Sequence, residues 1–161
     1  MTSLSRRSVL AGALGALAAG PALAQAPGFR GIEVDVRPLA AKGGGLAADL
    51  LRQVVTQEAR AVFADRIARG GPRLVIVLTS LQMTAYAGEG SGRWGGAGGG
   101  SDYLDGEALL LGARGEVLSR TPQLFAQPAN AGGAWFDPDS ERRRVVMLGR
   151  NYVAWLRRTL G

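Results

Sequence analysis

The chain has 161 residues, of which 47% are apolar, and its formal net charge is +6. It contains neither cysteine nor histidine, which excludes disulfides, thiolate or imidazole metal sites and catalytic pairs built on Cys or His. The bases are 18 arginines and one lysine, Lys42, and the length suits a single domain.

The first 24 residues have the three parts of an export signal. Arg6 and Arg7 form a charged start, and an uncharged run of Ala, Leu and Gly follows from Ala11 to Ala19. Ala22 and Ala24 are the small residues that an A-x-A cleavage site requires. We therefore expect cleavage after Ala24, which leaves a mature chain with a net charge of +4.

This segment resembles the bacterial twin-arginine (Tat) signal at Ser5, Arg6, Arg7 and Leu10. The resemblance implies the Tat translocase as a partner during export and the periplasm as the destination. Ordinary Sec export is one alternative, and an uncleaved signal that anchors the chain in the inner membrane is another. Glycines and Pro21 interrupt the apolar run, whereas a spanning helix needs about 20 apolar residues, so the anchor is disfavoured.

The next segments alternate between strand and helix patterns. Residues 31–37 alternate apolar and charged side chains, which predicts a strand with one wet face, ended by Pro38. Residues 46–69 have the spacing of an amphipathic helix, stopped by a Gly-Gly-Pro sequence. In residues 73–87, Arg73 is followed by five apolar residues in a row, Leu74 to Leu78, which is typical of a central strand.

The second half begins with a loop, because residues 88–100 contain eight glycines. Residues 103–111 and 116–121 are predicted to form a hairpin, and residues 122–133 to be irregular. We expect the last helix to begin with Asp137 as N-cap and Pro138 at its first position. Its predicted buried stripe consists of Val145, Leu148, Tyr152, Val153, Leu156 and Leu160.

The element order β-α-β-β-β-α predicts an α+β fold, in which two helices cover one face of a four-stranded mixed or antiparallel sheet. Residues 25–161 are expected to form this one domain. In element order and export signal the chain resembles small bacterial envelope proteins such as the lipopolysaccharide-assembly lipoprotein. The resemblance is architectural and implies an envelope location, but the lipid-attachment cysteine of such lipoproteins is missing.

Two sets of residues are candidates for contact with a partner. Arg93 and Trp94 lie together in the glycine-rich segment, where an exposed Trp beside an Arg is typical of contact sites. Arg143, Arg150 and Arg157 recur every seven residues and should share one helix face. Such a row suits anionic lipid, lipopolysaccharide phosphates or an acidic partner. The alternatives are a Trp94 folded back onto the sheet and a solvated arginine face.

Carboxylates are the only remaining catalytic groups of note. Asp105 and Glu107 share a strand face about 7 Å apart, within the range of a glycosidase pair. A dinucleotide-like Gly90-x-Gly92-x-x-Gly95 is not followed by the helix that a phosphate site needs. Helix capping explains the acids Asp137, Asp139 and Glu141 at the start of the last helix, so we expect no metal there. We also expect no cofactor, because the sequence contains no complete cofactor motif.

The sequence therefore favours an exported periplasmic or envelope-associated domain that is not an enzyme and binds another envelope component. Two alternatives remain: a carboxylate-dependent hydrolase, and a peripheral module for anionic membranes or lipopolysaccharide. A nucleic-acid partner is not expected for an exported protein with this charge.

Overall fold

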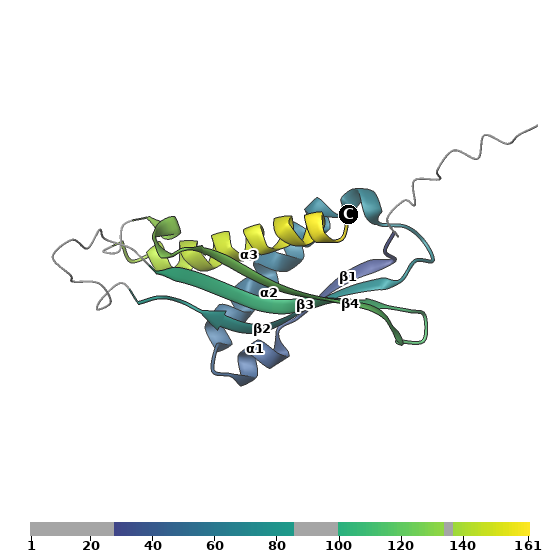
Figure 1. Cartoon of the computed structure of the whole chain (residues 1–161), viewed down its shortest axis with the longest axis horizontal. Helices are drawn as coiled ribbons and strands as arrows, with labels where there is room; N and C mark the ends of the chain where they lie inside the picture. Colours follow the sequence, from purple (N-terminus) through teal and green to yellow (C-terminus); the bar gives the residue numbers. More distant parts are fainter. Residues whose placement is uncertain (1–27, 86–99, 134–136) are drawn as a thin grey trace, which may run out of the picture.

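The structure is a computed structural model, and it describes residues 28–85, 100–133 and 137–161. One sheet has the strand order β1-β2-β3-β4, made of β1 (Gly31–Asp35), β2 (Arg73–Gln82), β3 (Ser101–Leu111) and β4 (Val117–Pro128). β1 pairs with β2 in parallel, and the other two pairs are antiparallel. Helices α2 (Gly45–Val62) and α3 (Ser140–Thr159) cover one face of this sheet (Figure 1). The predicted α+β architecture with a mixed sheet is confirmed.

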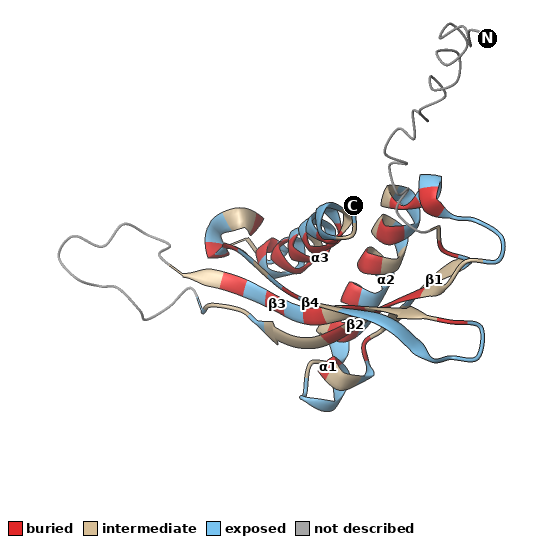
Figure 2. Cartoon of the chain, turned by 45° about the vertical axis from the view of Figure 1, so that its right-hand side comes forward, coloured by how far each residue is buried: buried red, intermediate tan, exposed pale blue. Residues whose placement is uncertain are grey.

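The core lies between the sheet and these two helices (Figure 2). Strand β3 shows why, because Leu104, Gly106 and Ala108 alternate inward while their neighbours face the other way. The buried stripe predicted for α3 is also correct: five of its members are almost completely buried and Leu160 packs against the core. The opposite side of the sheet, which we call the open face, has no helix of the α2–α3 layer on it.

The first helical region differs from the prediction in two ways. A short helix, α1 (Arg37–Ala41), follows β1, and its Leu39 reaches the core. The long helix α2 stops at Val62 rather than near residue 69, and a 3₁₀ turn, η1 (Ala64–Arg66), follows it. Phe63 and Arg66 are both buried at this point. Phe63 packs against Phe29 and Arg66 reaches the end of α3, and these contacts accompany the early end of the helix.

The hairpin of β3 and β4 is longer than the sequence suggested. β4 continues to Pro128, so the prediction that residues 122–133 are irregular is wrong for 122–128. Pro122 is tolerated inside this strand because β4 is an edge strand, where a missing N–H can face outward. A second 3₁₀ turn, η2 (Ala129–Gly132), then leads toward α3.

The start of α3 also differs from the prediction. The helix begins at Ser140 with Asp139 as its N-cap residue, and no side chain caps it, so neither Asp137 nor Pro138 has its predicted position. The Asp137 carboxylate instead accepts hydrogen bonds from the Asp139 N–H at 2.9 Å and from Arg143 Nη2 at 2.7 Å. These contacts lower the pKa of Asp137, chiefly through Arg143. The acid therefore shapes the turn before the helix.

Candidate functional site

Two glutamines of β4 hold α3 in place along the sheet. Gln123 Nε2 donates to the Tyr152 carbonyl at 2.8 Å, and Gln127 Nε2 donates to the Arg144 carbonyl at 3.0 Å. Four strand residues span about 13 Å and eight helix residues about 12 Å, so the two contacts are in register. The pairing of a later strand residue with an earlier helix residue shows that α3 runs antiparallel to β4.

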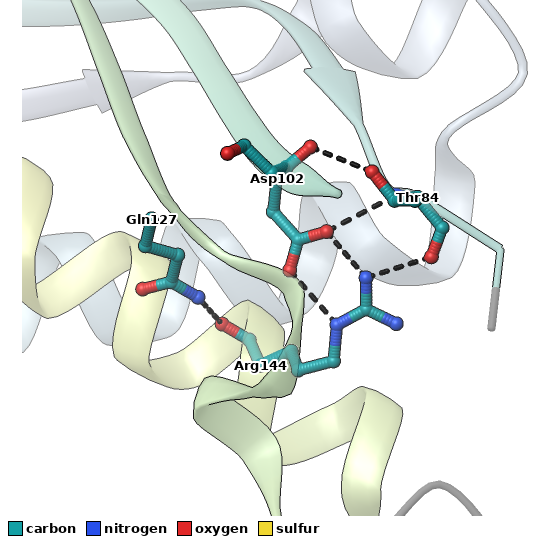
Figure 3. Close-up of polar contacts among 5 residues, drawn as sticks. Thr84, Asp102, Gln127 and Arg144 are labelled. Atoms are coloured by element: carbon teal, nitrogen blue, oxygen red, sulfur yellow. Dashed lines mark hydrogen bonds and ion pairs between the residues drawn. The ribbon is translucent and has the colours of Figure 1, made fainter. Parts of the chain in front are cut away.

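A buried ion pair joins the start of α3 to β3. Arg144 Nε donates to Asp102 Oδ2 at 2.8 Å, and its Nη2 also contacts Asp102 Oδ1 (Figure 3). The same Nη2 donates to the Thr84 carbonyl at 2.9 Å, and the Thr84 N–H donates to Asp102. Both charged side chains are almost fully buried. Because each is satisfied by several polar partners, the pair fixes one arrangement of α3 over the ends of β2 and β3.

The other end of α3 is held by an arginine of η1. Arg66 Nη1 donates to the carbonyls of Leu160 and Gly161, at 3.0 and 2.8 Å, and its guanidinium lies 4.7 Å above the Phe29 ring. Burial, and then the nearby charge of Arg157, lower the pKa of Arg66. This side chain satisfies carbonyls that a helix end leaves unpaired, so both ends of α3 are fixed.

With its inner side fixed, α3 presents nine residues outward, which we call the outer face of α3. Two adjacent rows with a spacing of four residues compose it, and none of these residues is buried. The rows are Arg142, Val146, Arg150, Ala154 and Arg158, and Arg143, Met147, Asn151 and Trp155. Figure 2 shows exposed residues along the side of α3 that is turned away from the sheet.

The outer face is basic and partly apolar. It contains four arginines and no acid, and the whole of α3 has six arginines against one acid, Glu141. Met147 and Trp155 are 39% and 47% exposed, although large apolar side chains in α3 otherwise pack inward. Arg158 lies over the Trp155 ring at 5.7 Å. An aromatic ring stacked with a guanidinium on an exposed helix is typical of a contact surface.

The three arginines singled out from the sequence differ in their surroundings. Arg143 donates to the Gly132 carbonyl and to Asp137, and Arg150 lies 3.9 Å from Glu58 of α2. Arg157 is turned away from the outer face: it pairs with Asp65 at 2.7 Å and lies over the Phe63 ring. Arg143 and Arg150 thus belong to the outer face, while Arg157 links α3 to η1.

A shallow hollow lies at the N-terminal half of the outer face and has a volume of about 420 Å³. It is lined by Asp139, Arg142, Arg143, Val146, Met147 and Arg150. Within the described ranges, Arg142 has no acid within ion-pair distance, and the pairs made by Arg143 and Arg150 are exposed. We call this feature the α3 hollow, and its chemistry is three guanidiniums around two apolar side chains.

The carboxylates proposed for hydrolysis lie on the open face of the sheet. Glu107 accepts hydrogen bonds from Arg120 Nη1 on both carboxylate oxygens, at 3.1 and 2.8 Å. Asp105 is exposed and accepts a hydrogen bond from the Thr79 hydroxyl at 3.2 Å. A second hollow, of about 350 Å³, includes Asp105 but not Glu107. Its other lining residues are Ser80, Gln82, Tyr103 and Leu124.

Tyr152 places a hydroxyl between α3 and the sheet. The side chain is fully buried, and its hydroxyl has no hydrogen-bond partner among the described residues. Burial raises the pKa of Tyr152 well above its usual range, and the charges of Asp105 and Glu107 raise it further. Gly106 leaves the room that this hydroxyl occupies, because a Cβ there would lie 2.8 Å from it.

Several predicted sites fall outside the described residues. These are the export residues Arg6, Arg7 and Leu10, the cleavage residues Ala22 and Ala24, and the loop pair Arg93 and Trp94. The part of the chain that the structure describes contains no helix long and apolar enough to cross a membrane. In that same part, no three His, Cys, Asp or Glu side chains group so that they could hold a metal ion.

No protein-family model matches the chain, and no curated protein matches it either. Among solved structures, the chain is similar to a "putative lipoprotein from Caulobacter crescentus CB15", with 15% sequence identity and a TM-score of 0.45. The match covers 80% of this chain and 86% of that chain. A likeness this distant transfers no activity and no partner to the present chain.

Proposed function

We propose that this chain is an exported domain of the bacterial cell envelope that binds another envelope component and performs no catalysis. One observation supports the binding role above the others: the outer face of α3 has four arginines, no acid, and the exposed Met147 and Trp155. Both ends of α3 are fixed by buried contacts, so this surface is presented as a rigid unit. The paired Arg6 and Arg7 support the envelope location.

The carboxylates of the open face support the absence of catalysis. Hydrolysis by a carboxylate pair needs two acids that face one substrate from suitable positions. Here both oxygens of Glu107 accept hydrogen bonds from Arg120, and the open-face hollow is lined by Asp105 but not by Glu107. The chain has no His or Cys that could replace the second group.

Export is tested first, by fractionating cells that produce the full chain and measuring the mass of the mature protein. We expect a periplasmic or membrane-associated product that begins at Gln25. We expect the Arg6→Lys/Arg7→Lys double variant to remain unprocessed in the cytoplasm, because a Tat-type signal depends on both arginines. A product that stays unprocessed in the cytoplasm with the wild-type signal would contradict the proposed location.

The binding role is tested with purified mature chain and isolated cell envelopes in a sedimentation assay. We expect the wild-type chain to sediment with the envelopes and the Arg142→Gln/Arg150→Gln/Arg158→Gln variant to stay in the supernatant. A matched control removes three arginines elsewhere, at Arg37, Arg114 and Arg120, and should sediment like wild type. Equal sedimentation of both variants would remove the outer face of α3 from the proposal.

A carboxylate-dependent hydrolase is the second candidate, and one observation favours it. Asp105 shares the open-face hollow with the phenol of Tyr103 and the apolar Leu124, a combination that can hold a sugar ring. Incubation of the mature chain with cell-wall glycan, followed by analysis of released fragments, decides between the two candidates. Release that is abolished by Asp105→Asn would favour the hydrolase.

A further inference from the structure

The outer face of α3 has two halves with complementary chemistry. Toward its N-terminal half lies the α3 hollow, with Arg142, Arg143 and Arg150 around Val146 and Met147. Toward its C-terminal half, Trp155 is exposed and stacked with Arg158. Because 20 helical residues extend about 30 Å, a ligand that engages both halves must itself offer a broad surface.

The hollow suits the phosphate group of a lipid headgroup. Guanidiniums bind phosphate oxygens through pairs of parallel hydrogen bonds, and three arginines line the hollow together with one carboxylate, Asp139. The pairs Arg143–Asp137 and Arg150–Glu58 are exposed, so they contribute little and a phosphate can displace them. Val146 and Met147 are the apolar residues of its lining.

The C-terminal half of the outer face, which presents Trp155, suits the boundary between lipid headgroups and acyl chains. Tryptophan is enriched at membrane interfaces because its ring is apolar and its indole N–H is polar. Helices that lie on a membrane turn such rings toward the lipid, while arginines on their polar side reach the headgroups. α3 lies on the side of the sheet opposite the open face (Figure 1), so its outer face is turned away from the sheet.

From these observations we propose that the outer face of α3 docks on the surface of a bilayer that contains anionic phospholipids. Lipid phosphates occupy the α3 hollow, and Met147 and Trp155 enter the headgroup region. This inference rests on the proposed function, since it names the envelope component that the domain binds. A lipid surface is the partner of choice, because a bilayer offers phosphates to the arginines and an apolar boundary to the exposed Met147 and Trp155.

The test uses the full mature chain and protein-free vesicles of phosphatidylcholine with or without phosphatidylglycerol. We expect binding to the vesicles with phosphatidylglycerol only, and we expect it to weaken strongly at high salt because the arginines are exposed. Each arginine removed from the outer face should lower the affinity about fivefold. Trp155→Ala should weaken binding at high salt as well, since its contribution is apolar.

The matched control is the Arg37→Gln/Arg114→Gln/Arg120→Gln variant, which has the same net charge as Arg142→Gln/Arg150→Gln/Arg158→Gln. Equal affinity of these two variants, or binding to neutral vesicles alone, would overturn the proposal. If wild-type chain sediments with envelopes but not with anionic vesicles, the lipid partner is wrong while the proposed function stands. If it sediments with neither, both proposals fail. Circular dichroism confirms that each variant is folded.

Discussion

Arg144 of α3 and Asp102 of β3 form a buried bidentate ion pair, although 42 positions separate them in the chain. Asp102 is fully buried and Arg144 nearly so, and Thr84 completes the network (Figure 3). Removing one member leaves an uncompensated charge in the interior. The Asp102→Asn variant should therefore lose about 3 kcal/mol of unfolding free energy in urea denaturation.

A double variant separates the pair from simple packing. Asp102→Asn/Arg144→Met should lose less stability than the two single variants combined, because no buried charge is left alone. If the losses were additive, the two side chains would not interact in the way the structure shows.

Removal of the Tyr152 hydroxyl should stabilise the fold. Its buried hydroxyl has no partner among the described residues, and an unsatisfied buried polar group costs about 1 kcal/mol or more. Tyr152→Phe should therefore stabilise the fold by about 1 kcal/mol in urea denaturation at pH 7. Tyr103→Phe, at an exposed position, is the matched control and should have little effect.

The same residue makes stability depend on alkaline pH. Burial raises the pKa of Tyr152 in the folded state. Below about pH 10, the pKa of tyrosine in the unfolded chain, this group leaves the free energy of unfolding independent of pH. Above that value the free energy of unfolding falls as pH rises, since only the unfolded chain releases the proton. Ultraviolet titration should show one of the three tyrosines ionising only when the protein unfolds. In Tyr152→Phe this late step should be absent, and ordinary ionisation of all three tyrosines in the native chain would argue against the buried position.

Gly106 is required where α3 meets the sheet. A Cβ at this position would lie 2.3 Å from the Val77 carbonyl oxygen and 2.8 Å from the Tyr152 hydroxyl. Gly106→Ala should cost about 2 kcal/mol, because backbone must move. Gly45→Ala is the control, since nothing lies near its Cβ position and alanine favours the first turn of α2. A thermal melt that shows equal midpoints for both variants would contradict the close approach.

The amphipathic elements were predictable from the sequence because each has a local period. The buried stripe of α3 and the apolar side of the first strand are examples, although that strand ends at Asp35 and Pro38 lies inside α1 instead of ending the strand. The end of β4 was missed because Pro122 and Pro128 read as breakers, and only the sheet order shows that β4 is an edge. The end of α2 was missed because Phe63 and Arg66 are buried by elements distant in the chain.

Part of the candidate site could also be predicted from the sequence. Asp102 alternates inward with Leu104 and Ala108, so a buried acid on β3 could be predicted from the strand pattern. Its partner Arg144 could not, because the pairing depends on how α3 packs on the sheet. The seven-residue arginine row predicted a shared face, but helix geometry alone could not show that Arg157 turns toward Asp65. Exposure of Met147 and Trp155 became evident only once the inner side of α3 was known.

A single-cysteine label at Met147 tests the docking of α3 most directly, because the native chain contains no cysteine. An environment-sensitive fluorophore attached through Met147→Cys is compared with the same fluorophore attached through Ala126→Cys, an exposed position on the open face of β4. With vesicles that contain phosphatidylglycerol, we predict a blue shift and quenching by lipid-borne quenchers for the label at 147 and neither for the label at 126. Bound protein whose label at 147 stays in water, or whose two labels respond equally, would contradict the proposal that α3 faces the membrane.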